Sequence, residues 1–79
     1  MNLNIVTPGN ALFTGECISV RVPGINGPFE VLDRHAPIIS LLRRGRIKVQ
    51  DTNKAETFFN IESGVVKVNR NDVVILVNG

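Results

Sequence analysis

The stretch that decides the fold class is residues 16–22, which reads Glu16-Cys17-Ile18-Ser19-Val20-Arg21-Val22. Its apolar residues alternate with other types, a period of two that is typical of a β-strand with one face buried and the other in water. We therefore expect Ile18, Val20 and Val22 to face a core. Residues 46–50 repeat the pattern around Ile47 and Val49. Val, Ile and Thr, which favour strands, supply 23 of the 79 residues.

Turn-forming Pro, Gly, Asn and Asp residues divide the rest of the chain into strand-length pieces. No piece keeps a helical period over ten residues, so no helix is expected. Short, half-buried strands at this spacing favour two antiparallel sheets packed face to face, a β-sandwich rather than a barrel. The expected strands are 3–7, 11–14, 16–22, 29–32, 38–42, 46–50, 57–62, 65–68 and 73–77.

Length and composition limit the chain to one domain over residues 1–79. A single cysteine excludes an intrachain disulfide, and one histidine with one cysteine is too few for a zinc site. No apolar run approaches the roughly 18 residues of a membrane span, and no signal-peptide pattern begins the chain. We expect a soluble domain that starts at its own Met1 and holds neither metal nor cofactor.

Catalytic residues are not expected. His35 is the only histidine that could activate a nucleophile, and no spacing places a serine or Cys17 beside it. The seven acidic residues show no paired spacing for acid–base chemistry. The residues alone therefore indicate a non-enzyme, in which His35 is either a hydrogen-bonded loop residue or an interface residue and Cys17 is a small structural filler.

The chain has one basic cluster, composed of Arg43, Arg44, Arg46 and Lys48, and a net charge of +2. The cluster around Gly45 fits the solvated tip of a hairpin, and it also fits a site that binds phosphate or an acidic partner surface. It also fits a second function, a small β-barrel module that binds nucleic acid through these four side chains. Three of the four phenylalanines lie in apolar runs typical of a core, which disfavours the stacking platforms that single-stranded nucleic acids need.

An ordered series of motifs between residues 3 and 77 is similar to the epsilon subunit of F-type ATP synthase. The series comprises residues 3–8, Phe13-Thr14-Gly15, residues 22–27, residues 29–39 with His35-Ala36-Pro37, residues 42–47, residues 63–68 and residues 71–76. The resemblance implies a flattened β-sandwich of two mainly antiparallel sheets with about nine to ten short strands.

The resemblance also implies a function without chemistry of its own. Epsilon is a rotor subunit of the central stalk, which binds the gamma subunit, rests on the polar loops of the c-ring and supports coupling of proton translocation to ATP synthesis. It implies no nucleic acid, no small-molecule substrate and no cofactor. The expected location is peripheral to a membrane, on the cytoplasmic face of the bacterial inner membrane or the stromal face of the thylakoid.

Two groups of residues match functional segments of the family. Gly27, Pro28, Phe29 and Glu30 match the turn that faces the c-ring, with Glu30 as the expected charged partner. His35, Ala36, Pro37 and Ser40 match the segment that lies against gamma.

The sequence departs from the family at two points. Pro28 stands where an acidic residue is common, so the ring contact is expected to differ in detail. Family members commonly continue into two C-terminal helices that inhibit ATP hydrolysis, whereas these residues end at Asn78-Gly79. We therefore expect a form without the helical domain and assign no inhibitory role.

Overall fold

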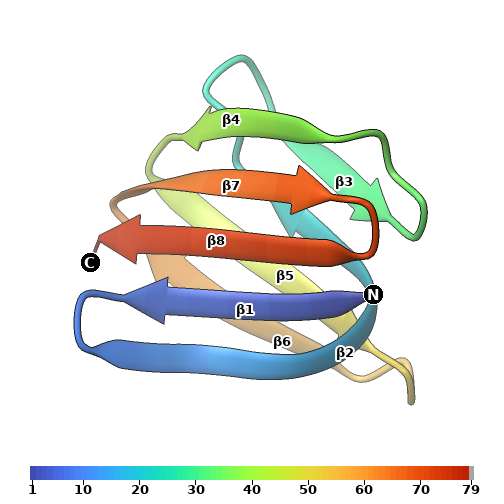
Figure 1. Ribbon diagram of the computed structural model, residues 1–79. Coiled ribbons are helices and arrows are strands. Elements are labelled where there is room, and N and C mark those ends of the chain that lie inside the picture. The colour runs from blue at the N-terminus through green and yellow to red at the C-terminus, as the bar shows by residue number, and fades with distance from the viewer. Residues whose placement is uncertain (79) are drawn as a thin grey trace.

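A computed structural model describes residues 1–78 and contains eight β-strands and no helix in that range (Figure 1). Consequently, no helix among these residues is long and apolar enough to cross a membrane. The strands are β1 (Asn2–Thr7), β2 (Asn10–Val22), β3 (Phe29–Leu32), β4 (Ile38–Leu42), β5 (Gly45–Asp51), β6 (Glu56–Ile61), β7 (Ser63–Asn69) and β8 (Asp72–Asn78).

The strands form two layers that share one long strand. Layer A has the order β4-β7-β8-β1-β2, and layer B contains β5 and β6 with β3, which pairs with β2 on its other side. The 13-residue β2 belongs to both layers, because its first half pairs with β1 and its second half with β3 and β5. In Figure 1 the strands of layer B cross behind those of layer A. The predicted sandwich is confirmed, and β1 with β8 is a parallel pair among antiparallel ones.

The predicted number of strands was too high. Residues 11–14 and 16–22 were expected as two strands, but they form the single strand β2, which continues through Gly15. A glycine inside a strand weakens it locally, because it has no side chain to pack. Pairing with β1 instead keeps the strand continuous, since Gly15 lies opposite Leu3 in the ladder.

A β-bulge in β2 changes which side chains are buried. The register between β2 and β5 shifts between Cys17 and Ser19, so that Ile18 has no partner in this ladder. As a result Ile18 is 40% exposed, whereas Cys17 is 1% exposed and joins the core. The expectation that Ile18 faces the core was wrong, and the same expectation for Val20 and Val22 is confirmed.

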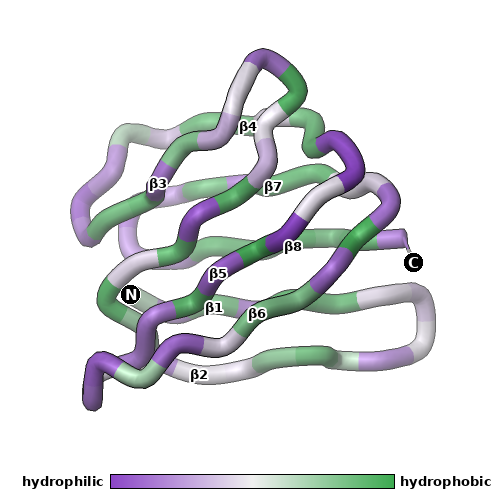
Figure 2. The backbone as a smooth tube through the Cα atoms, turned by 180° about the vertical axis from the view of Figure 1, so that it is seen from behind, coloured by the Kyte–Doolittle hydropathy of each residue, from purple (hydrophilic) through white to green (hydrophobic). Residues whose placement is uncertain are grey.

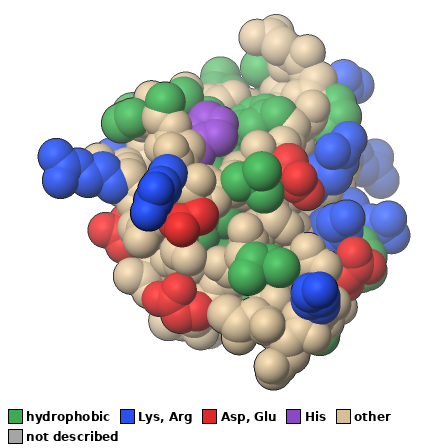
Figure 3. All heavy atoms as spheres, turned by 90° about the vertical axis from the view of Figure 1, so that its right-hand side faces the viewer, with side chains coloured by type: hydrophobic (Ala, Val, Ile, Leu, Met, Phe, Trp, Pro, Cys, Tyr) green, Lys and Arg blue, Asp and Glu red, His purple; other side chains and the backbone are tan. Residues whose placement is uncertain are grey.

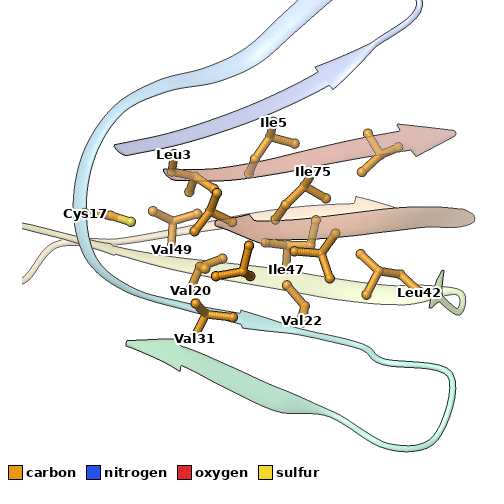
Figure 4. Packing of buried hydrophobic residues seen from close by; sticks show 14 of the residues in the cluster. Leu3, Ile5, Cys17, Val20, Val22, Val31, Leu42, Ile47, Val49 and Ile75 are labelled. Carbon is orange, nitrogen blue, oxygen red and sulfur yellow. The ribbon is translucent and has the colours of Figure 1, made fainter. Parts of the chain in front are cut away.

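The core lies between the two layers and is almost entirely aliphatic (Figure 4). Leu3, Ile5 and Ile75 enter it from layer A, while Val20 and Ile47 enter from layer B. Three phenylalanines, at positions 13, 29 and 59, pack against its edges as the sequence indicated. Close packing of this kind resists deformation of the two layers.

Candidate functional site

The single histidine lies in the loop between β3 and β4. His35 is half-buried, and its Nδ1 lies 2.7 Å from the carbonyl oxygen of Ala36, so the imidazole braces its own loop. The loop borders a hollow of about 510 Å³ that also touches Arg70 and Asn71 in the turn between β7 and β8. Figure 3 views this end of the sandwich and shows the histidine at the surface, close to exposed basic side chains.

The described residues contain no arrangement for metal or nucleophilic chemistry. Within residues 1–78 no group of three or more His, Cys, Asp or Glu side chains could hold a metal ion. Cys17 lies in the core, where burial raises the pKa of its thiol above the usual value and the nearby N-terminal ammonium group opposes that rise. The thiol is therefore a small filler of the core.

The Cys17 thiol is expected to react with iodoacetamide at least about 100-fold more slowly in the folded protein than in denaturant. The reason is that alkylation needs an exposed thiolate, and both burial and the raised pKa oppose its formation. The measurement is the alkylation rate by mass spectrometry at pH 8 with and without urea. Equal rates under the two conditions would show that the thiol is not part of the core.

The four residues expected to face the ring lie at the start of β3 and differ in orientation. Gly27 has a φ of 127°, a left-handed conformation that favours glycine, and Pro28 is exposed beside it. Phe29 packs against the core. Glu30 is exposed on the outer face of layer B, opposite Arg21 in the ladder. The side chains of Pro28 and Glu30 are therefore accessible to a partner, while that of Phe29 supports the turn from within.

The four residues expected to face gamma divide between a loop and a strand. Ala36 and Pro37 are exposed next to His35, just before β4 begins. Ser40 lies opposite the buried Val66, and its hydroxyl donates to the carbonyl oxygen of Leu41 at 3.2 Å. Its neighbours Ile39 and Leu41 point outward instead, with 73% and 59% of their surface exposed.

The predicted basic cluster does not form one surface. Arg43 and Arg44 lie in the connection that links β4 in layer A to β5 in layer B. Because β4 and β5 do not pair, the expected hairpin tip was wrong. Arg44 pairs with Glu62 at 3.2 Å, and Lys48 lies 3.6 Å from Glu56. Arg46 covers the ring of Phe58 at 4.2 Å. Phe58, the exposed phenylalanine, is therefore covered by Arg46 and not open for base stacking, which does not support the nucleic-acid alternative.

The outer face of layer A carries an apolar surface that the sequence interpretation missed. Leu41, Val65, Leu76 and Val6 are successive cross-strand partners in β4, β7, β8 and β1, so they form one row across the sheet. Ile39 and Val74 lie on the same face in the next row, on either side of the exposed Lys67, which is the ladder partner of both. We call these six apolar residues the apolar face. Figure 2 shows the sequence pattern behind this face: hydrophobic colour runs continuously along β8, whereas it alternates with hydrophilic colour along β5.

A shallow hollow lies at one end of the apolar face. Its volume is about 580 Å³, and its walls include Val6, Leu41, Val65 and Leu76. Ile25 from the loop after β2 closes one side, because its amide donates to the carbonyl oxygen of Leu41 at 2.9 Å. A contiguous exposed apolar surface on a sheet marks a contact with another protein. The geometry therefore indicates a docking surface.

Comparison with known proteins identifies the family. A family model described as "ATP synthase, Delta/Epsilon chain, beta-sandwich domain" matches residues 1–79. The chain belongs to this family. The ATP synthase epsilon chain of Chlorobium limicola is 38% identical over 74 residues, which are 94% of this chain and 84% of that relative. The epsilon chain of Campylobacter curvus is 42% identical over 79 residues, all of this chain and 61% of that relative.

Solved structures share the fold of this delta/epsilon domain. One chain of the Euglena gracilis mitochondrial ATP synthase, solved with F1 and the c-ring, matches with a TM-score of 0.91 at 19% identity, over 98% of this chain and 49% of that one. A chain from the central stalk and c-ring of the Tetrahymena thermophila enzyme matches with a TM-score of 0.82 at 14% identity, over 99% of this chain and 63% of that one. At these identities the likeness concerns the β-sandwich alone.

Proposed function

We propose that this chain is a non-catalytic rotor subunit of an F-type ATP synthase, which links the gamma subunit to the c-ring and supports coupling of proton translocation to ATP synthesis. Its place would be peripheral to the membrane, on the cytoplasmic face of a bacterial inner membrane or the stromal face of a thylakoid. The observation that carries the proposal is the apolar face, exposed on a domain whose relatives are epsilon chains of this enzyme.

Gamma is proposed to dock on the apolar face. Leu41 and Leu76 there are 59% and 52% exposed, an arrangement that costs free energy in water and is relieved when a partner covers it. The segment from His35 to Pro37 leads directly into β4, which contains Ser40 and forms one edge of this face. His35, Ala36 and Pro37 are therefore proposed to frame the gamma contact, with the outward side chains of β4 supplying its apolar part. Ser40, which lies opposite the buried Val66, is proposed to support this segment from the inner side of β4.

The c-ring contact is proposed at the turn before β3. Gly27 and Pro28 project from the loop between β2 and β3, and Glu30 is the nearest carboxylate that follows them. Phe29 anchors the turn to the core, and a rigid turn suits a contact that transmits torque. The loop is also closed by a hydrogen bond in which the Gly27 amide donates to the carbonyl oxygen of Gly24 at 2.9 Å.

The test of this function is reconstitution with the gamma subunit encoded in the same genome. We expect the two chains to co-elute in size-exclusion chromatography and to bind with a dissociation constant of about 1 μM or tighter, as stable interfaces of standard size do. Absence of binding to gamma, alone or assembled with the ring, would contradict the proposal. Nucleic acid of mixed sequence serves as the control ligand and should not bind.

His35→Ala is expected to weaken binding to gamma by about 1–2 kcal/mol, because the loop that frames the contact loses the contact between the His35 ring and the carbonyl oxygen of Ala36.

Glu30→Lys should leave the affinity for gamma unchanged within about 0.5 kcal/mol but reduce proton-driven ATP synthesis in reconstituted membranes. Calorimetric titration of both variants against gamma measures the first effect. A loss of gamma binding confined to Glu30→Lys would show that the two contacts are reversed.

A further inference from the structure

Three basic side chains lie close together on the outer face of layer B, one from β2 and two from β5. Arg21 in β2 lies directly opposite Lys48 in β5, and Arg46 lies two residues before Lys48 on the same face of β5. The intervening Ile47 is fully buried, so Arg46 and Lys48 both point away from the core. This arrangement is separate from the apolar face, which lies on the other layer, but it borders the turn proposed to contact the c-ring, because Glu30 is the ladder partner of Arg21.

The three cations line a hollow of about 430 Å³. Its remaining walls are apolar, made by Val22, Pro23, Pro28 and Phe58, and none of the residues that line it is acidic. The guanidinium of Arg46 is held 4.2 Å from the centre of the Phe58 ring, which fixes its position over one wall. The hollow therefore combines three positive charges with a rigid apolar floor.

Two carboxylates flank this hollow without entering it. Glu56 lies 3.6 Å from Lys48, and Glu30 is the ladder partner of Arg21 on its other side. Both carboxylates are exposed, so solvent screens their pairing with the cations. Like charges directly opposite one another in a ladder, as Arg21 and Lys48 are, destabilise a sheet. An anion bound between them would reduce this repulsion further than Glu56 does through its exposed contact with Lys48.

We propose that this hollow, lined by Arg21, Arg46 and Lys48, binds the phosphate group of a phosphorylated compound. Guanidinium groups donate parallel hydrogen bonds that match the geometry of phosphate oxygens, and the lysine adds a compact positive charge. The volume exceeds that of a phosphate ion alone, so the apolar walls would contact the organic part of the ligand. A soluble phosphate ester and a phospholipid headgroup both carry this chemistry.

The test uses the 79-residue chain and two probes, inorganic phosphate and lipid vesicles. Backbone amide chemical shifts are followed by NMR as phosphate is added at constant ionic strength maintained with chloride. In parallel, the chain is sedimented with phosphatidylcholine vesicles and with vesicles that also contain phosphatidylglycerol. The variant is Lys48→Gln, and the matched control is Arg43→Gln, which removes one positive charge from an exposed residue outside the hollow.

We expect saturable shifts centred on Arg21, Arg46 and Lys48, with a dissociation constant of about 1–10 mM for inorganic phosphate. Lys48→Gln should weaken this binding by about tenfold and Arg43→Gln by less than twofold. Sedimentation only with phosphatidylglycerol vesicles, lost in Lys48→Gln but kept in Arg43→Gln, would assign a lipid headgroup. Phosphate shifts without sedimentation would assign a soluble ester.

Two results would overturn the phosphate site. One is the absence of saturable shifts together with the absence of sedimentation. The other is an equal loss of phosphate or vesicle binding in Lys48→Gln and Arg43→Gln, which would indicate diffuse attraction by net charge. Thermal melts of both variants verify that they are folded, and Arg21→Gln repeats the measurement from the other strand. Binding of gamma by Lys48→Gln is measured separately, so failure of the phosphate site is distinguishable from failure of the rotor function.

Discussion

Val20→Asp is expected to leave the chain unfolded at 25 °C. Val20 is fully buried between the two layers, with Val49 and Val31 as its ladder partners on either side (Figure 4). A carboxylate there would lose its hydration without gaining a partner, at a cost of several kcal/mol. A domain of this size has a total stability on the order of 5 kcal/mol. Circular dichroism and NMR peak dispersion report the loss of structure.

Ile18→Asp is the matched control for this prediction. It places the same charge two residues earlier in β2, at a position that simple alternation would also bury. Because the bulge turns Ile18 outward, this variant should fold, with a loss of at most about 1 kcal/mol from reduced strand propensity. Unfolding of both variants would contradict the bulge, and cooperative melting of both would contradict the core position of Val20.

Leu76→Glu should weaken binding to gamma by at least about 30-fold, or about 2 kcal/mol, while the domain remains folded. Leu76 occupies the middle of the apolar face, between Val65 and Val6, and borders the hollow closed by Ile25. In the proposed complex a glutamate at this position would bury a charge against an apolar partner. Calorimetric titration against gamma measures the effect.

Leu32→Glu provides the control for the apolar face. Leu32 and Leu76 are each 52% exposed, but Leu32 lies in β3 on the outer face of layer B. The two variants therefore add the same charge at the same exposure on opposite layers. Equal losses of gamma binding would show that the contact is not specific to layer A, and a larger loss in Leu32→Glu would place it on layer B.

The candidate site was only partly accessible to sequence reasoning. The motif around His35, Ala36 and Pro37 was recognised, and the structure places it in a braced loop before β4. The apolar face was missed, although five consecutive apolar residues at 73–77 signal a strand that is apolar on both sides. In a single sequence such a run is also consistent with complete burial, and only the assembled sheet shows which side remains exposed.

By itself, the sequence determined the elements that depend on neighbouring residues. The spacing of turn residues predicted β3 and β4 with their observed bounds. Alternation predicted the inward direction of Val20, Val22, Ile47 and Val49. Turn chemistry predicted where most strands end. These features were accessible because side-chain alternation and turn preference act within a few residues along the chain.

Tertiary structure alone decided the features that depend on which strands pair. It joined two predicted strands into β2, turned Ile18 outward at a bulge and set β1 parallel to β8. It also brought Arg21 opposite Lys48, 27 positions later in the chain. The physical reason is that ladder register is selected by the packing of two whole layers around one core, a condition that no local stretch of sequence contains.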